Sequence, residues 1–382
     1  MKKVGLTVCY DTKNYGSQLQ VLATITKIEQ IGYKTEIIRY KKKISPYFIV
    51  QNCPRILNPF FVKAKVKRII KNKKIKKDSS ISNEICKRNK RFSKFADEKF
   101  KNLSRVYNGW NDLKKSNNDY DEFLCGSDQL WLPNNLGSHF YTLEFVDNEK
   151  KKIAYATSFG VKSIPWYQKN RTKKYLNRFD FLSNREISGS KIVKELTGKE
   201  SKVVCDPTLL LTAKEWEKII SHKKVEKEKY IFCYFLGTNK EHREAANKLK
   251  EITGFNIVTI PFLDNFVESD KAFGDKRLYD IDTIDFVNYI RNAEYVLTDS
   301  FHGSIFSILN NKQFITFDRF NDKSKDSRNT RIDSLFSILN IKNRRFNGDI
   351  NKIFEKIDYD DVEKKLSKLR EDSIDYLLTA LK

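Results

Sequence analysis

The residue best suited to acid–base chemistry in this sequence is His302, which stands in the segment TDSFHG. An apolar strand pattern ends here and a helical pattern begins, so the imidazole can point into a crevice, where Gly303 lets backbone approach closely. Histidine donates and accepts protons near neutral pH, which predicts a general acid or base at this position. The alternative is a histidine packed and hydrogen-bonded inside the fold. His139, His222 and His242 lack such a setting, and we expect them on the surface.

Three further polar segments are expected where strands end: NYGS (14–17), GSDQ (126–129) and SNRE (183–186). In an open parallel sheet, the carboxyl ends of the strands and the helix N-termini behind them form a crevice that binds anions such as phosphate. The substrate-binding residues predicted from these segments and from TDSFHG are Asn14, Tyr15, Gly16, Ser127, Asp128, Gln129, Ser300 and Gly303.

Arg185 follows the apolar run FDFLSN and precedes a helical pattern, a position from which it can form a bidentate pair with a carboxylate or phosphate. The alternative is a salt bridge with Glu186 or Glu195 near the helix start. Asp128 and Asp206 also follow strand patterns and are candidates to orient a sugar hydroxyl. Aspartate before a helix or turn is more typical of a capping residue, and DPT at 206–208 indicates a turn.

Other chemistries have little support. No two histidines or cysteines stand at metal-ligand spacing, and the acidic pairs in DYD (119–121) and DID (280–282) are too short to be specific. Neither a Walker loop nor a glycine-rich dinucleotide fingerprint occurs, so nucleotide hydrolysis and hydride transfer lose their usual support. We therefore predict no metal site and no cofactor.

The elements that position these residues form an α/β pattern. A strand at 3–10, a loop at 11–18, a helix at 19–30 and a strand at 35–40 make a βαβ unit, whose two strands are expected to be parallel. With 382 residues the chain is long enough for two such domains. We predict two Rossmann-like domains that face a central cleft, with bounds 1–212 and 228–345, followed by a helical tail at 346–382.

The α/β alternation stops between residues 41 and 116, where the sequence predicts a basic insertion of amphipathic helices with a polar break near 78–82. One interpretation is a solvated helical hairpin. The other is a surface that rests on anionic lipid.

The formal net charge is +24, from 73 Lys and Arg against 49 Asp and Glu. This excess indicates a nucleic-acid, anionic-membrane or anionic-substrate partner, although a compositionally biased genome produces the same excess. Nucleic acid is disfavoured because the basic region 60–101 lacks interleaved stacking aromatics and a binding motif. Six scattered cysteines, no signal-peptide pattern and no apolar run of membrane-spanning length predict a cytoplasmic protein, in at most peripheral contact with the inner face of the membrane.

Taken in order, the motifs NYGSQLQ, GSDQLW, YATSFG, SNREISG, DPTLLL and YVLTDSFHGSIFSILNNKQF resemble the polysaccharide pyruvyl transferase family over residues 4–345. The resemblance implies a fold similar to GT-B glycosyltransferases, with phosphoenolpyruvate as donor. The acceptor would be a hydroxyl pair on a hexose of a cell-surface glycan, free or lipid-linked, and the product a pyruvate ketal. It also implies that His302 is the catalytic histidine and that Arg185 holds the donor.

The sequence departs from the family pattern at Ser300, where many members carry an arginine two residues before the histidine. Arg319, Arg328 or Arg331 is our hypothesis for the missing cation, and Arg331 is included among the substrate-binding residues. The alternative function is a GT-B-like glycosyltransferase that uses a nucleotide sugar in the same crevice.

Overall fold

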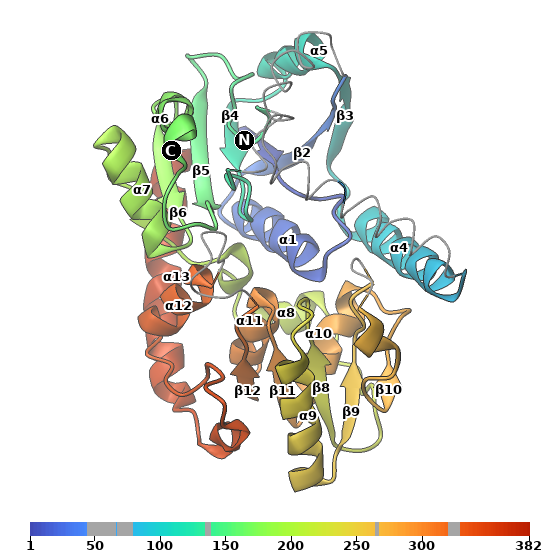
Figure 1. Ribbon diagram of the computed structural model, residues 1–382. Helices are drawn as coiled ribbons and strands as arrows, with labels where there is room; N and C mark the ends of the chain where they lie inside the picture. The colour runs from blue at the N-terminus through green and yellow to red at the C-terminus, as the bar shows by residue number, and fades with distance from the viewer. Residues whose placement is uncertain (44–65, 67–78, 134–138, 264–266, 320–328) are drawn as a thin grey trace.

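The computed structural model describes residues 1–43, 66, 79–133, 139–263, 267–319 and 329–382. These residues form two lobes, each built on a sheet whose strand pairs are all parallel (Figure 1). The first sheet has seven strands in the order β3-β2-β1-β4-β5-β6-β7, and the second has five in the order β10-β9-β8-β11-β12. The α/β class predicted from the sequence is confirmed.

The first lobe contains, in chain order, β1 (Lys3–Thr7), α1 (Tyr15–Gln30), β2 (Lys34–Lys41), α4 (Ser79–Lys99), β3 (Leu103–Asn108), α5 (Trp110–Lys114), the 3-10 helix η2 (Lys115–Asn118), β4 (Glu122–Cys125), β5 (Lys151–Thr157), η3 (Trp166–Gln168), α6 (Lys169–Leu176), β6 (Phe181–Asn184), α7 (Ile187–Thr197), β7 (Lys202–Val203), η4 (Pro207–Leu209) and α8 (Ala213–Ile219).

The second lobe contains β8 (Tyr230–Tyr234), α9 (Lys240–Thr253), β9 (Asn256–Thr259), η5 (Glu268–Lys271), β10 (Lys276–Arg277), α10 (Thr283–Asn292), β11 (Tyr295–Thr298), α11 (Phe301–Leu309), β12 (Gln313–Thr316), α12 (Thr330–Ile338) and η6 (Ile350–Phe354). The tail forms the helix α13 (Tyr359–Leu381). Of the described helices, none combines the length and apolar character that crossing a bilayer requires.

The prediction that residues 41–116 form a helical insertion is wrong for their C-terminal part. Residues Leu103–Asn108 form β3, which pairs with β2 at the edge of the first sheet. This strand alternates only weakly between buried and exposed residues, so its sequence carries little strand signal. The predicted break near 78–82 is also misplaced, because α4 begins at Ser79, while residues 44–65 and 67–78 lie outside the described part of the chain.

Helix α1 begins four residues earlier than predicted. Asn14 is its N-cap and accepts a hydrogen bond from the backbone N–H of Ser17, so Tyr15, Gly16 and Ser17 form the first helical turn rather than a loop. An N-cap asparagine satisfies a backbone donor that the helix cannot, which explains the early start.

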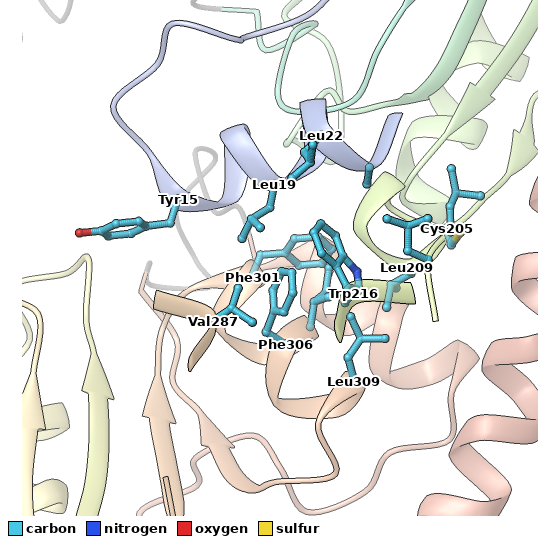
Figure 2. Close-up of a cluster of buried hydrophobic side chains, with 14 of the residues drawn as sticks. Tyr15, Leu19, Leu22, Cys205, Leu209, Trp216, Val287, Phe301, Phe306 and Leu309 are labelled. Carbon is cyan, nitrogen blue, oxygen red and sulfur yellow. The ribbon is translucent and has the colours of Figure 1, made fainter. Parts of the chain in front are cut away.

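The two lobes share one hydrophobic cluster that runs from β1 and α1 into α10 and α11. Figure 2 shows side chains from α1, from the segment after β7 and from α11 gathering around Trp216 and Phe306, whose rings lie 5.3 Å apart. Tyr15 stacks on Phe286 of the second lobe with ring centroids 4.9 Å apart. Apolar burial therefore holds the carboxyl-end regions of the two sheets together.

The tail returns to the first lobe. Within α13, Ser373 accepts a hydrogen bond from the Cys205 N–H, and Tyr376 donates one to the Ala154 carbonyl, each at 2.9 Å. At its start the Tyr359 hydroxyl bonds the Lys312 carbonyl of the second lobe. The helix thus contacts both lobes, and in the first lobe it bonds Cys205, the residue before Asp206.

Candidate functional site

His302 lies in the first turn of α11 and reaches the first lobe. Its side chain is 9% exposed, and its ring stands so close to Gly16 that a methyl group there would overlap it. Ser300 is the N-cap of α11 and accepts a hydrogen bond from the Gly303 N–H at 3.3 Å. A side chain at Gly303 would collide with Thr298, so this glycine permits tight packing of α11 on β11.

Arg185, directly after β6, pairs with Asp206, which follows β7. The Arg185 Nη1 atom lies 2.5 Å from Asp206 Oδ2, and both side chains are almost fully buried. The alternative pairing with Glu186 or Glu195 is wrong. Glu186 accepts hydrogen bonds from Ser158 and from the backbone of the 158–160 segment, while Glu195 pairs with Lys169. Because β6 and β7 are neighbours in a parallel sheet, the residues after them meet at one edge.

Asp206 joins the two lobes electrostatically. Its Oδ2 atom lies 3.7 Å from His302 Nε2 and accepts a hydrogen bond from Gln20 Nε2 at 2.6 Å. Burial acts to raise the pKa of the Asp206 carboxyl, but the neighbouring His302 imidazole and Arg185 guanidinium outweigh it and hold that pKa well below its usual range. From the sequence, Asp206 is a candidate to orient a hydroxyl and, more typically, a turn residue; only the adjacency of β6 and β7 marks it as a neighbour of Arg185.

The GSDQ segment packs against the first turn of α1. Ser17 donates a hydrogen bond to Asp128 Oδ2 at 2.8 Å, and Gln20 donates one to Ser127 Oγ at 3.1 Å. Burial raises the pKa of Asp128, but the charges of Arg185 and His302 outweigh it and lower that pKa. Asp128 also has a φ of 95°, a left-handed conformation that costs energy for a non-glycine residue.

The predicted residues divide into two groups. Those gathered around the His302 ring and the Arg185–Asp206 pair are Gly16, Ser127 and Asp128. The others make structural contacts: Asn14 caps α1, Tyr15 packs on Phe286 of the second lobe, Gln129 lies against Gly160, Ser300 caps α11 and Gly303 packs on Thr298.

A second arginine approaches from α12. The Arg331 Cζ atom lies 5.2 Å from the ring centroid of Phe301, and the Arg185 Cζ atom lies 4.7 Å from the same centroid. Burial, followed by the positive charge of Arg185, lowers the pKa of Arg331 to about 9. The buried Arg185 Nε and Nη2 and Arg331 Nε atoms have no hydrogen-bond acceptor among the described residues. Two guanidinium groups therefore lie beside the Phe301 ring, and each has an N–H donor for which the described residues offer no acceptor.

Arg319, another candidate for the missing cation, is engaged by Asp299. Arg319 donates a hydrogen bond to the Asp299 carbonyl at 2.9 Å, and its Nε lies 3.6 Å from Asp299 Oδ1. Arg328 lies outside the described residues.

The DID aspartates bind an arginine across the lobes. Arg91 of α4 lies 3.3 Å from Asp280, 3.8 Å from Asp282 and 3.2 Å from Asp285, measured between the closest charged atoms of each pair. Asp282 is also the N-cap of α10. In the DYD pair, Asp119 accepts a hydrogen bond from Tyr107. These carboxylates have structural partners.

The remaining histidines differ in burial. The expectation that His242 lies on the surface is wrong, because it is 3% exposed and packs on Phe317 with ring centroids 4.6 Å apart. Its position on the inward face of α9 explains the burial. His139 is partly exposed and bonds Glu144, and His222 is exposed.

Comparison with solved structures identifies the fold. A putative UDP-N-acetylglucosamine 2-epimerase from Listeria monocytogenes matches with a TM-score of 0.50 and 10% identity, over 98% of this chain and 90% of that one. UDP-GlcNAc 2-epimerase from Neisseria meningitidis, bound to UDP-GlcNAc, matches with a TM-score of 0.50 and 9% identity, over 99% of this chain and 100% of that one. Both are GT-B enzymes, which confirms the GT-B-like fold.

Comparison of the sequence with curated proteins found no match. The family model for polysaccharide pyruvyl transferase, however, matches residues 14–321, a range that includes Gly16, Arg185, Asp206 and His302. The chain therefore belongs to the polysaccharide pyruvyl transferase family.

Proposed function

We propose that this protein transfers the pyruvyl group of phosphoenolpyruvate to a hydroxyl pair on a hexose, in a cell-surface polysaccharide or its lipid-linked precursor, and forms a cyclic ketal. One observation carries the proposal. The imidazole of His302 and the buried guanidinium of Arg185 both approach Asp206 Oδ2, and the Arg185 Nε and Nη2 donors find no acceptor in the part of the chain that the structure describes. A proton donor next to spare cationic donors fits a small anion that must be protonated on carbon.

The arginines supply the anion site. Arg185 is partly neutralised by Asp206, but the described residues place no carboxylate within ion-pair distance of Arg331. A desolvated guanidinium with no carboxylate partner among the described residues, beside another guanidinium, is stabilised when an anion binds. Phosphoenolpyruvate carries a carboxylate and a phosphate, each of which accepts paired N–H donors from arginine.

The reaction balances with His302 as acid. The imidazolium gives its proton to the methylene carbon of the donor, and the adjacent carbon becomes oxocarbenium-like. One sugar oxygen attacks that carbon, the carbon–oxygen bond to phosphate breaks, and the second sugar oxygen closes the ring. Of the two hydroxyl protons, one returns to His302 and the other leaves with phosphate. The arginines stabilise the negative charge that grows on the departing phosphate.

A cytoplasmic site of action, with peripheral contact between the basic helix α4 and the inner face of the membrane, belongs to the same proposal. It is supported by free cysteines at 9, 86, 125, 205 and 233 and by the net charge of +24. Helix α4 carries Lys87, Lys90, Lys94 and Lys99.

The test is incubation of the purified protein with phosphoenolpyruvate and a panel of aryl and lipid-linked hexosides. We expect acceptor-dependent release of inorganic phosphate, and a new methyl signal in the proton NMR spectrum of the sugar product. Phosphoenolpyruvate alone should raise the melting temperature. Stabilisation by a nucleoside diphosphate, with sugar transfer from a nucleotide sugar and no phosphate release, would instead establish the glycosyltransferase alternative.

A further inference from the structure

We propose that Asp206 is a positioning residue whose two carboxylate oxygens have separate tasks: Oδ1 builds the turn after β7, and Oδ2 sets the geometry of Arg185 and His302. The kinetic part of this inference rests on the proposed function, whereas the geometric part does not.

The Oδ1 atom has only local partners. It accepts hydrogen bonds from the Thr208 N–H at 3.0 Å and from the Thr208 hydroxyl at 2.6 Å, as the N-cap of η4. These bonds hold the carboxylate in one rotamer, so the position of Oδ2 follows from the backbone of the turn.

The Oδ2 atom has partners from three distant parts of the chain. Arg185 donates to it at 2.5 Å from the end of β6, and Gln20 donates at 2.6 Å from α1. His302 Nε2 lies 3.7 Å away, on the other lobe. One oxygen atom is thus the common reference point for the proposed acid and for the proposed anion-binding arginine.

The distances indicate how Asp206 acts on each group. Arg185 uses Nη1 for Asp206, which keeps Nε and Nη2 for another acceptor. At 3.7 Å the imidazole is beyond hydrogen-bond distance, so the carboxylate orients the ring by charge without binding its proton. The Asp206 side chain is 0% exposed, so it acts through these two groups and not by contact with substrate.

The experiment compares Asp206→Asn with Thr208→Val. Asparagine keeps an oxygen for the turn but places an amide donor opposite the Arg185, Gln20 and His302 donors. Valine at 208 removes the hydroxyl bond to Oδ1 but keeps the bond from the backbone N–H of residue 208, so the carboxylate keeps its rotamer and Oδ2 its partners. We expect D206N to lower kcat by roughly 10²- to 10⁴-fold, the range that acid–base catalysis contributes. T208V should stay within about threefold of wild-type kcat, since it leaves those groups in place.

A second readout does not depend on the reaction. With only four histidines in the chain, ¹⁵N-histidine NMR resolves the His302 ring signals, which His302→Asn identifies by their loss. D206N should shift these signals and T208V should not. If the wild type releases no phosphate from phosphoenolpyruvate, the proposed function fails, but the NMR comparison still tests Asp206.

Unchanged His302 signals together with wild-type kcat in D206N would overturn the proposal. If D206N does not fold, Asp206→Glu is the substitute, because it keeps the charge but moves Oδ2 by one methylene. D206E should fold, with shifted His302 signals and reduced kcat. Wild-type signals and rate in D206E would overturn the proposal equally.

Discussion

The second lobe contributes two buried histidines to histidine–aspartate pairs that have the same spacing but different surroundings. His302 Nε2 lies 3.7 Å from Asp206 Oδ2, and His242 Nδ1 lies 3.7 Å from Asp299 Oδ2. His242 and Asp299 both belong to the second lobe, where His242 packs on Phe317 and accepts a hydrogen bond from Asn239 at 3.2 Å. The partner of His302 is Asp206 of the other lobe. The His302 ring faces the backbone of Gly16.

The pKa shifts of the two aspartates have opposite directions. Burial raises the pKa of Asp299 despite the nearby Arg319, whereas the pKa of Asp206 is lowered by His302 and Arg185 against the effect of burial. Burial, with help from the charge of Arg243, also lowers the pKa of His242 to about 4. Spacing alone therefore does not define a site. Spare donors and a position between lobes distinguish the His302 pair from a pair that serves the core.

Replacement of each histidine is the strongest test of this distinction. His302→Asn should lower the rate of phosphate release from phosphoenolpyruvate by roughly 10²- to 10⁴-fold, because it removes the proton donor. His242→Gln should keep the rate within about threefold at a temperature where it is folded, since His242 has no part in proton transfer. Initial rates with matched melting curves measure both. Equal losses in the two variants would contradict the distinction.

The His242 pair should make folding stability depend on pH. The pKa of His242 is about 4 in the fold and near 6.5 in an unfolded chain. Its contribution is therefore fully present above about pH 6.5 and is lost as the pH falls toward 4. We expect the free energy of unfolding to fall by about 2 to 3 kcal/mol between neutral pH and pH ~4.5 from this group.

Urea unfolding at both pH values measures this loss. His242→Gln should reduce the difference, while replacement of the exposed His222 by Gln should leave it unchanged. An H242Q profile that parallels the wild type would show that protonation of His242 is not the cause.

Gly16→Ala should impair the His302 pair alone. The added methyl group would overlap the imidazole and displace it from Asp206, which should reduce activity by about 10- to 100-fold because a small misplacement of a catalytic group is costly. Gly254→Ala, at the C-terminus of α9, should lower the melting temperature through its positive φ of 72° but leave the rate unchanged. Wild-type activity in G16A would show that the ring tolerates displacement.

The smallest predicted effect is a change in the apparent KM for phosphoenolpyruvate, which should differ between variants of Arg331 and Arg319. Arg331→Ala should raise the apparent KM for phosphoenolpyruvate by about tenfold, because it removes a charge-assisted hydrogen bond to the donor. Arg319→Ala should change it less, because Arg319 is bound to Asp299. Steady-state kinetics with varied donor measures both. A larger KM effect in R319A would indicate that Arg319, and not Arg331, is the missing donor-binding cation.

Much of the element order was predictable from apolar periodicity. The strands predicted at 3–10 and 35–40 correspond to β1 and β2, and the predicted change from strand to helix at TDSFHG lies between β11 and α11. The predictions were wrong at β3, where the apolar pattern is short, and at the start of α1, where the N-cap residue sets the first helical residue. The burial of His242 was missed because one polar residue on an apolar helix face carries no signal of its own.

The strand-end positions of the polar residues could be read from the sequence, and in a parallel α/β sheet this suffices to place Gly16, Asp128 and Arg185 at one edge of the first sheet. The pairing of Arg185 with Asp206 and the approach of His302 from the second lobe could be learned from the fold alone. That arrangement depends on which strands are neighbours and on how the apolar faces of α1, α8 and α11 dock. Contacts between residues so far apart in the chain come from packing the whole molecule, which no local pattern encodes.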